Sequence, residues 1–231
     1  MNNLCIIPAR GGSKRIPRKN IKSFLGEPII AYSIKVALKS GLFNQVMVST
    51  DDSEIAEISK KYGAKIPFMR SIDNSNDFAS TIEVIIEVIE KYESLGYSFD
   101  KVCCIYPTAP LISEERLTEG YRKIETEKLD SVFPVVSFSY PIWRGLRFSE
   151  DGLIHMIWPE FNNKRSQDLE ASYHDAGQWY WMSVESVKNK KTLFTDNTSS
   201  IVLNQLEVQD IDNIDDWEIA ELKYERIQNS K

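Results

Sequence analysis

Short apolar runs alternate with stretches of helical periodicity through the first 136 residues. The apolar runs have the length of buried strands, and they occur at residues 4–7, 45–49, 102–106 and 131–136. Helices with one apolar face are predicted to begin near residues 28, 53, 79 and 113. This order of elements predicts an α/β fold, with a mostly parallel central sheet and helices on both of its faces.

The alternation breaks between residues 138 and 176. This stretch contains Trp143 and Trp158, several prolines and few helical repeats, so it is predicted to be an inserted arm. Tryptophans exposed on such an arm would indicate a subunit interface. Regular order is predicted to return with a strand at 178–183, a helix at 184–190 and a last strand at 208–211. Asp215 or Asp216 is then predicted to cap a final helix.

The composition narrows the class of protein. A chain of 231 residues predicts a single domain, residues 1–231, that includes the arm. The net charge of −6 argues against a general nucleic-acid-binding protein. No run approaches the roughly 18 apolar residues of a membrane helix. The three cysteines form no metal or redox motif, so we expect buried, reduced thiols in a cytoplasmic protein.

The most informative segment is the basic loop, residues 8–20, which leaves the first predicted strand. It contains Gly11 and Gly12, and six basic residues lie between Arg10 and Lys22. Glycines allow close approach of a ligand, and consecutive backbone N–H groups can form an anion-binding nest. Because open α/β sheets bind ligands at the carboxyl ends of their strands, the loop predicts a polyphosphate site. The alternative is a solvated basic loop.

A pair of acidic residues, Asp210 and Asp212, is the second candidate. Residues i and i+2 of a strand share a face, so the two carboxylates would point together from the predicted last strand. A divalent cation that also binds substrate phosphates would relieve their repulsion. Taken alone, however, such a motif is more often an acidic turn before a helix.

Three further segments carry hydrogen-bonding groups. Residues 106–111 follow a predicted strand, residues 76–81 open a helix, and residues 173–178 contain His174, one of two histidines. Each segment could contact a base, a ribose or a sugar, and each could equally be turn or capping chemistry. No nucleophile–histidine set is evident.

Together these segments resemble one known family. Residues 6–21, Ile-Ile-Pro-Ala-Arg-Gly-Gly-Ser-Lys-Arg-Ile-Pro-Arg-Lys-Asn-Ile, are similar to the N-terminal loop of the CMP-acylneuraminate (nonulosonate) cytidylyltransferases. The family's later motifs follow in order as Val-Ser-Thr-Asp-Asp-Ser-Glu-Ile-Ala (48–56), Pro-Thr-Ala-Pro-Leu (107–111), Arg-Ser-Gln-Asp-Leu (165–169) and Asp-Ile-Asp (210–212). The resemblance implies a Rossmann-like nucleotidyltransferase fold and a homodimer held by the arm at 138–176.

The resemblance also implies a reaction and the residues that perform it. CTP and a nine-carbon 2-keto sugar acid would give a CMP-sugar and pyrophosphate, with Mg²⁺ or Mn²⁺ as the metal. The implied CTP contacts are Arg10, Gly11, Ser13, Lys14, Lys19, Asn20, Ser80 and Thr81. The implied sugar contacts are Tyr106, Thr108, Arg165, Gln167, His174 and Asp175. Asp210 and Asp212 are the implied metal ligands, and together with Arg10 and Lys19 they form the implied catalytic set.

The chain departs from the sialic-acid enzymes of this family in the sugar site. Tyr106 stands where those enzymes carry Gln, and Ser166 replaces the second Arg of Arg-Arg-Gln-Asp. Residues 174–181 are similar to the pseudaminic acid branch, so pseudaminic acid is the expected sugar. The alternatives are a sialic or legionaminic-type acid, or a non-catalytic nucleotide-sugar-binding protein. Trp179 and Trp181 share one strand face, either in the sugar pocket or in the core.

Overall fold

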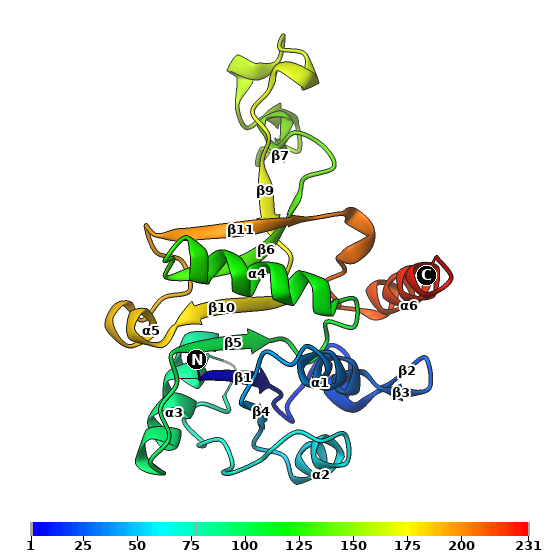
Figure 1. Cartoon of the computed structure of the whole chain (residues 1–231). Coiled ribbons are helices and arrows are strands. Elements are labelled where there is room, and N and C mark those ends of the chain that lie inside the picture. Colours follow the sequence, from blue (N-terminus) through cyan, green and yellow to red (C-terminus); the bar gives the residue numbers. More distant parts are fainter. Residues whose placement is uncertain (1, 77, 231) are drawn as a thin grey trace.

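The computed structural model describes residues 2–76 and 78–230, so Asp77 of the predicted 76–81 segment lies outside the described residues. A seven-stranded sheet forms the centre of the molecule (Figure 1). Its strands are β1 (Asn3–Pro8), β4 (Gln45–Ser49), β5 (Lys101–Ile105), β6 (Ser131–Ser137), β9 (Tyr173–Asp175), β10 (Trp179–Ser183) and β11 (Thr198–Leu203). They lie in the order β11-β6-β10-β5-β1-β4, and β9 pairs with β6.

The sheet is mostly parallel, as the sequence predicts. β1 pairs in parallel with β4 and β5, and β6 pairs in parallel with β11. β10 runs antiparallel between β5 and β6, and β9 runs antiparallel to β6. Two short hairpins lie outside this sheet. They are β2 (Ser23–Phe24) with β3 (Glu27–Pro28), and β7 (Leu146–Phe148) with β8 (Ile154–Met156).

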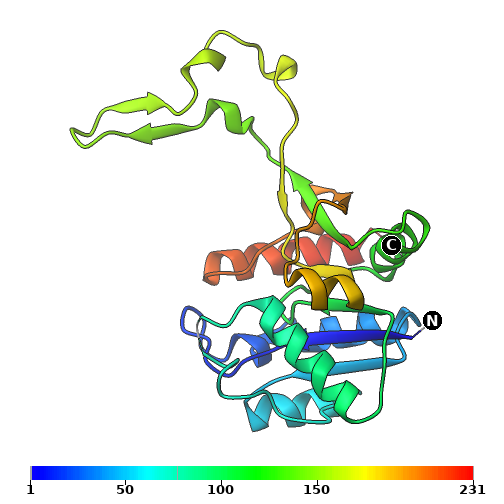
Figure 2. The ribbon, with the colours of Figure 1, turned by 90° about the vertical axis from the view of Figure 1, so that its left-hand side faces the viewer.

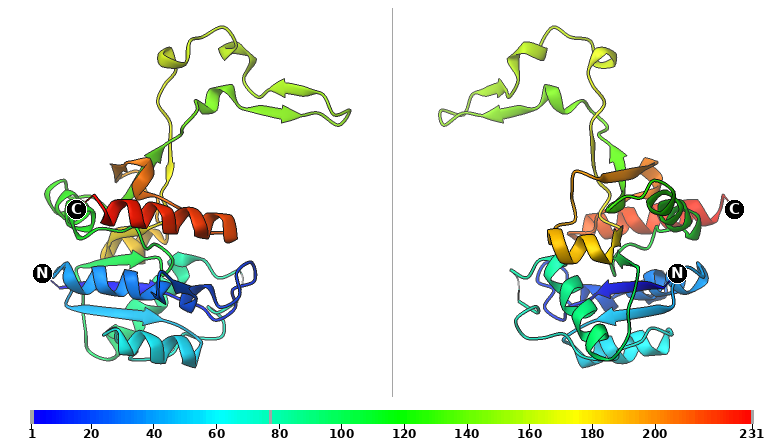
Figure 3. Two further views of the ribbon diagram at one scale, coloured as in Figure 1. Left: turned by 90° about the vertical axis from the view of Figure 1, so that its right-hand side faces the viewer. Right: turned by 60° about the vertical axis from the view of Figure 1, so that its left-hand side comes forward.

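Helices cover both faces of the sheet. They are α1 (Ile29–Lys39), α2 (Ser53–Lys61), α3 (Thr81–Ser94), α4 (Glu114–Thr126), α5 (Val184–Lys190) and α6 (Ile214–Gln228). One hydrophobic core joins α1, α2 and α4 to the sheet face that carries Cys5 and Ile7 of β1. A second core joins α3 and α5 to the opposite face, which carries Leu4 and Ile6. Figure 3 brings α1 and α6 forward in one view and α3 and α5 forward in the other. None of the helices in 2–76 and 78–230 is long and apolar enough to cross a membrane.

A third, smaller core connects the basic loop to the C-terminal helix. Its buried members are Ile16, Phe24, Ile29, Ile211, Trp217 and Ala220. Phe24 of β2 packs edge-on against Trp217 of α6, with ring centroids 5.6 Å apart. Aromatic pairs in this geometry stabilise beyond the area that they bury. The segment that follows the basic loop is therefore fixed against the C-terminal helix.

The arm leaves the sheet after β6 and returns through β9. Figure 2 shows it projecting away from the rest of the molecule, with the β7–β8 hairpin extended to one side. Three short 3₁₀ helices lie along it, namely η2 (Ile142–Arg144), η3 (Pro159–Phe161) and η4 (Ser166–Asp168). Trp143 packs against Trp158 at 5.6 Å and against Phe161 at 5.3 Å between ring centroids. The tryptophans thus stabilise the arm itself, and the dimer stays a prediction.

The prediction of a last strand at 208–211 is wrong. This segment is irregular, and it follows the short 3₁₀ helix η5 (Gln205–Glu207). Its apolar residues are buried in two different cores, Val208 in the first and Ile211 in the third, so their pattern reflects packing without a strand ladder. The strand at the β6 end of the sheet is β11. The sequence analysis does not predict it, because its first three residues, Thr-Ser-Ser, are polar.

The helix caps agree in part with the sequence. Asp52 caps α2 and Ser113 caps α4, close to where these helices are predicted to begin. The cap of α6 is Asn213 and not Asp215 or Asp216, because its side chain accepts the Asp216 N–H while the Asp216 carboxylate accepts the Asn213 N–H, each at 3.0 Å.

Candidate active site

The basic loop borders a cavity of about 440 Å³ at the carboxyl end of β1, here called the basic-loop cavity. The loop contributes Arg10, Ser13, Lys14, Arg15, Lys19 and Asn20 to its lining. The remaining lining residues are Pro8, Arg70, Ala79, Thr81, Val84, Tyr106, Pro107 and Thr108. Six of the eight residues predicted to contact CTP are therefore brought to one cavity, together with Tyr106 and Thr108.

The loop does not form the predicted nest of consecutive N–H groups. The Gly11 N–H donates to Asp51 Oδ1 at 3.0 Å, and the Ser13 N–H donates to the Gly11 carbonyl at 3.0 Å. A Cβ at Gly11 would lie 2.8 Å from an Asp52 carboxylate oxygen, so glycine is required there by close packing. The loop is therefore expected to bind an anion mainly through its side chains and less through its backbone.

Lys19 connects the loop to the acidic pair. Lys19 begins a one-turn 3₁₀ helix, η1 (Lys19–Ile21), and its ammonium donates to the Ile211 carbonyl at 2.7 Å. Arg15 Nη1 forms an ion pair with Asp212 Oδ2 at 2.7 Å. These contacts follow from the third core, in which Ile16 and Ile211 are both buried. The basic loop and the acidic pair therefore lie in one region of the molecule.

The charges in this region perturb one another. Burial lowers the pKa of Lys19, and the nearby carboxylates of Asp212 and Asp210 oppose that shift. Burial and the neighbouring Asp212 raise the pKa of Asp210 above its ordinary value. Two carboxylates that repel each other in this way are a suitable donor pair for a hard divalent cation. Since no group of three or more His, Cys, Asp and Glu side chains forms a cage in the described part of the chain, such a cation would need further oxygen ligands from substrate or water.

The acidic pair also lines a second cavity, of about 410 Å³, here called the acidic cavity. Its lining residues are Val136, His174, Asp175, Ala176, Gln205, Val208, Gln209, Asp210, Asp212, Asp216 and Lys223. The predicted sugar contacts His174 and Asp175 thus lie in the same cavity as the predicted metal ligands. The Arg15–Asp212 pair and the Lys19–Ile211 hydrogen bond link this cavity to the basic-loop cavity.

An aromatic wall stands between the two predicted binding regions. Tyr106 Oη lies 3.2 Å from Thr81 Oγ1, and the Tyr106 and Tyr180 ring centroids are 5.4 Å apart. The Tyr180 hydroxyl donates to Asp175 Oδ2 at 2.6 Å. Trp179 and Trp181 are fully buried on the opposite sheet face, so for these two tryptophans the core alternative is the correct one.

Four predicted site residues, Gly11, Ser80, Arg165 and Gln167, do not line either cavity. Ser80 is the N-cap of α3, and its hydroxyl and backbone exchange hydrogen bonds with Glu83 in a capping box. Arg165 and Gln167 are exposed on the arm, where Arg165 Nε donates to Asp168 Oδ2 at 2.9 Å. The sequence leaves open whether Ser80 contacts a ligand or caps a helix, and the structure favours the cap.

The sequence analysis missed two basic residues. Arg70 lines the basic-loop cavity, is 9% exposed and donates through Nε to Ser49 Oγ at 3.0 Å. Lys223 lines the acidic cavity and donates to the carbonyls of Gln205 and Val208 at 2.9 and 2.6 Å. Neither belongs to a recognisable motif, and the only signal for Arg70 is a cation directly after an apolar run.

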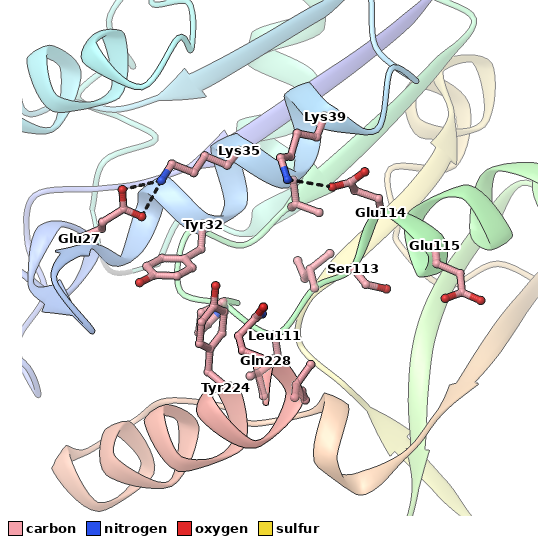
Figure 4. A pocket seen from close by; sticks show the side chains of 14 residues that line it. Glu27, Tyr32, Lys35, Lys39, Leu111, Ser113, Glu114, Glu115, Tyr224 and Gln228 are labelled. Atoms are coloured by element: carbon pink, nitrogen blue, oxygen red, sulfur yellow. Dashed lines mark hydrogen bonds and ion pairs between the residues drawn. The ribbon is translucent and has the colours of Figure 1, made fainter. Parts of the chain in front are cut away.

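Another cavity, of about 480 Å³, lies between α1, α6 and the start of α4 (Figure 4). Its two lysines are already paired. Lys35 Nζ contacts both carboxylate oxygens of Glu27 at 2.5 and 2.6 Å, and Lys39 lies 3.6 Å from Glu114. Because none of the predicted site residues line this cavity, it supplies control positions for mutagenesis and no candidate site.

Comparison with known proteins agrees with this geometry. A family model described as cytidylyltransferase matches residues 4–178. A pseudaminic acid cytidylyltransferase of Campylobacter jejuni subsp. jejuni serotype O:2 is 45% identical over 224 residues, which is 97% of each chain. A CMP-N,N'-diacetyllegionaminic acid synthase of Legionella pneumophila subsp. pneumophila is 32% identical over 96% of this chain and 95% of that protein. The fold matches CMP:2-keto-3-deoxy-manno-octonic acid synthetase complexed with CTP, with a TM-score of 0.70 and 17% identity over 99% of this chain and 100% of that one.

Proposed function

The chain belongs to the cytidylyltransferase family, and on that premise we propose that it joins CMP from CTP to a nine-carbon 2-keto sugar acid and releases pyrophosphate. Pseudaminic acid is the proposed sugar, because the 45% identical relative named for it is matched over 97% of both chains. The observation that carries the proposal is the basic-loop cavity, where Arg10, Lys14 and Lys19 gather in a protein of net charge −6.

The basic-loop cavity is the proposed CTP site. Arg10, Lys14 and Lys19 would bind the triphosphate through charge-assisted hydrogen bonds, which are about twice as strong as neutral ones. Thr81 and Thr108 also line the cavity and offer hydroxyl groups that would be neutral partners for a base or ribose. The Asn20 amide donates to the Arg10 carbonyl at 2.9 Å and so holds the start of the loop in place.

The proposed reaction is an in-line displacement at the α-phosphorus of CTP. The anomeric hydroxyl oxygen of the sugar forms a bond to that phosphorus, and the bond from the α-phosphorus to the oxygen bridging to the β-phosphate breaks. The hydroxyl proton is released, and pyrophosphate leaves with the bonding electron pair. Positioning and charge neutralisation provide most of the catalysis in such transfers. Arg10 and Lys14 would neutralise the leaving group, and Lys19 would keep the loop beside Asp210 and Asp212.

Asp210 and Asp212 are the proposed ligands of Mg²⁺ or Mn²⁺. Their oxygen-only donor set suits a hard cation, and burial together with the neighbouring Asp212 raises the pKa of Asp210. When bound, the metal supplies charge neutralisation at the phosphate and lowers the pKa of the attacking hydroxyl. Arg15, which pairs with Asp212 at 2.7 Å, would hold that carboxylate in position until CTP arrives.

The acidic cavity is the proposed place of the sugar. His174 and Asp175 offer polar partners there, and the Tyr180 hydroxyl holds the Asp175 carboxylate through a hydrogen bond of 2.6 Å. Arg165 and Gln167 stand on the exposed arm, so the proposed homodimer is the arrangement in which they would serve a sugar site. The free, fully buried thiols of the three cysteines suit a reducing compartment, and we place the reaction in the cytoplasm.

The test is pyrophosphate release from CTP in the presence of pseudaminic, legionaminic-type and N-acetylneuraminic acids. Release with pseudaminic acid supports the proposal. Release only with a legionaminic-type acid would favour the second candidate function, for which the 32% identical relative is the supporting observation. Calorimetric CTP binding without pyrophosphate release from any of these sugars would instead identify a nucleotide-binding protein.

A further inference from the structure

Residues 48–56 form a motif to which the proposed reaction gives no role. Asp51 and Asp52 lie between β4 and α2, and Asp52 Oδ1 accepts the Ile55 N–H at 2.9 Å as the cap of α2. Helix capping needs only one of these two carboxylates. Both are nevertheless directed at the basic loop. Asp51 Oδ1 accepts the Gly11 N–H at 3.0 Å, and Asp52 binds Arg18.

Arg18 has two unusual features. Its backbone is left-handed, with φ of 55°, a conformation that non-glycine residues adopt only when surrounding contacts enforce it. Its Nη1 and Nη2 atoms donate to the two carboxylate oxygens of Asp52 at 2.5 and 3.0 Å, and Nη2 also donates to Glu54 Oε2 at 2.5 Å. This two-pronged geometry is specific to arginine. Arg18 is absent from the described residues that line the basic-loop cavity.

The two aspartates therefore hold opposite ends of the same loop. Asp51 fixes Gly11, next to Arg10, and Asp52 fixes Arg18, next to Lys19. A Cβ atom added at Gly11 would lie 2.8 Å from the Asp52 carboxylate. Gly11 at one end of the loop is therefore packed against the residue that binds Arg18 at the other end. Two fixed carboxylates beside the loop also reduce the repulsion among its cations when no phosphate is bound.

We propose that Asp51, Asp52, Arg18 and Glu54 form a loop anchor that holds the phosphate-binding cations in position, with Arg18 as a positioning residue and not a phosphate contact. The proposal rests on the proposed CTP site. The state of charge agrees with it, because the Arg18 guanidinium holds the pKa of Asp52 down at about 2. The Asp52 carboxylate therefore stays ionised at neutral pH.

Substitution of Arg18 by lysine separates the anchor from a phosphate contact. Arg18→Lys keeps the positive charge but loses the two-pronged geometry, so the anchor predicts that CTP binding weakens about tenfold, as with Arg18→Met. A phosphate contact predicts that Lys retains most of the affinity. The dissociation constant of CTP is measured by calorimetry on the intact protein.

Lys22→Met is the matched control for charge. Lys22 belongs to the same run of basic residues, but its ammonium lies 4.9 Å from the Trp217 ring centroid, away from the anchor. The expected change in CTP affinity is less than about twofold, since Lys22 is not among the described residues that line the basic-loop cavity. An equal loss in Lys22→Met and Arg18→Met would show that charge alone matters and would overturn the anchor.

Asp52→Asn separates the anchor from helix capping. Asparagine caps helices about as well as aspartate, so the melting temperature should change little. Loss of the ion pair between Arg18 and residue 52 should nevertheless raise the KM for CTP about tenfold and leave the KM for the sugar unchanged. A parallel rise in both KM values, or Arg18→Lys with unaltered CTP binding, would refute the anchor while the proposed function stands. Absence of CTP binding in the unmodified protein would refute both.

Discussion

The ammonium group of Lys19 donates a hydrogen bond of 2.7 Å to the backbone carbonyl of Ile211, although 192 residues separate the two in sequence. This contact brings a cation of the basic loop to the segment that carries Asp210 and Asp212. Groups suited to a polyphosphate and groups suited to a divalent cation therefore share one wall. The contact is available because Ile16 and Ile211 are buried together, so the arrangement of the site depends on the third core.

Arg10→Ala tests the basic loop. We expect kcat/KM to fall about 100-fold or more, since a charge-assisted phosphate contact in a dry site contributes about 3 kcal/mol. The fold should persist, because Arg10 lines the basic-loop cavity and lies outside the three hydrophobic cores. Steady-state kinetics and thermal melting are the measurements. Lys35→Ala, at the cavity between α1 and α6, should keep full activity. A folded Arg10→Ala protein with unchanged turnover would contradict the assignment.

Chelation tests the acidic pair. EDTA should abolish pyrophosphate release, and Mg²⁺ or Mn²⁺ should restore it, because oxygen ligands bind hard cations. Asp212→Asn should raise the metal concentration that gives half-maximal activity. A metal titration of both proteins at saturating CTP measures this. Full activity in EDTA would rule out the metal.

Lys223→Met tests how the acidic pair is positioned. The segment 205–212 has no strand ladder, and Lys223 holds it through the carbonyls of Gln205 and Val208. Loss of a side chain that orients metal ligands typically weakens metal binding about 10-fold to 100-fold, so half-saturation by Mg²⁺ should shift by that factor. CTP affinity without metal should not change. Arg226→Met, on the exposed end of the same helix, is the control. Equal metal titrations for the two variants would contradict this role.

The sequence predicts elements well where packing is regular and poorly where it is not. β4 and α5 occur at the predicted residues, because β4 has three consecutive apolar residues and α5 has valines three residues apart that are both buried. β11 was missed since its first half is polar, and the segment at 208–211 was mistaken for a strand because its apolar residues fill two separate cores. Neither signal is local, so no window of sequence contains it.

The candidate site was predicted as motifs and not as geometry. The basic loop and the acidic pair were found by composition, spacing and resemblance. The use of the Gly11 N–H by Asp51 depends on where β4 ends in space, and the burial of Arg70 depends on Ser49 at the same strand end. Such tertiary contacts carry no sequence signature.

His174→Ala tests the sugar choice. His174 lines the acidic cavity beside Asp175, so its loss should reduce the preference for pseudaminic acid over N-acetylneuraminic acid. CTP binding should change less than the sugar preference, since His174 lies outside the basic-loop cavity among the described residues. The ratio of kcat/KM values for the two sugars is the measurement. Equal or higher kcat/KM for N-acetylneuraminic acid in the unmodified protein would contradict the branch assignment.

The arm is predicted to hold a symmetric dimer. Phe148 and Ile154 are paired across the β7–β8 hairpin and are 75% and 56% exposed, so the arm presents apolar surface that a second copy would cover. Phe148→Glu should convert a dimer to a monomer in sedimentation velocity at micromolar concentration. Ile72→Glu, at a 90% exposed position outside the arm, should leave the dimer intact. A monomeric unmodified protein would contradict the prediction.

Pyrophosphate release from CTP and pseudaminic acid, with Mg²⁺ present, tests most directly whether the basic loop and the acidic pair act as one cytidylyl-transfer site. The account predicts one pyrophosphate and one CMP-sugar for each CTP consumed, and loss of both products in Arg10→Ala and in Asp212→Asn. A protein that binds CTP but releases no pyrophosphate with any nine-carbon 2-keto sugar acid would contradict it.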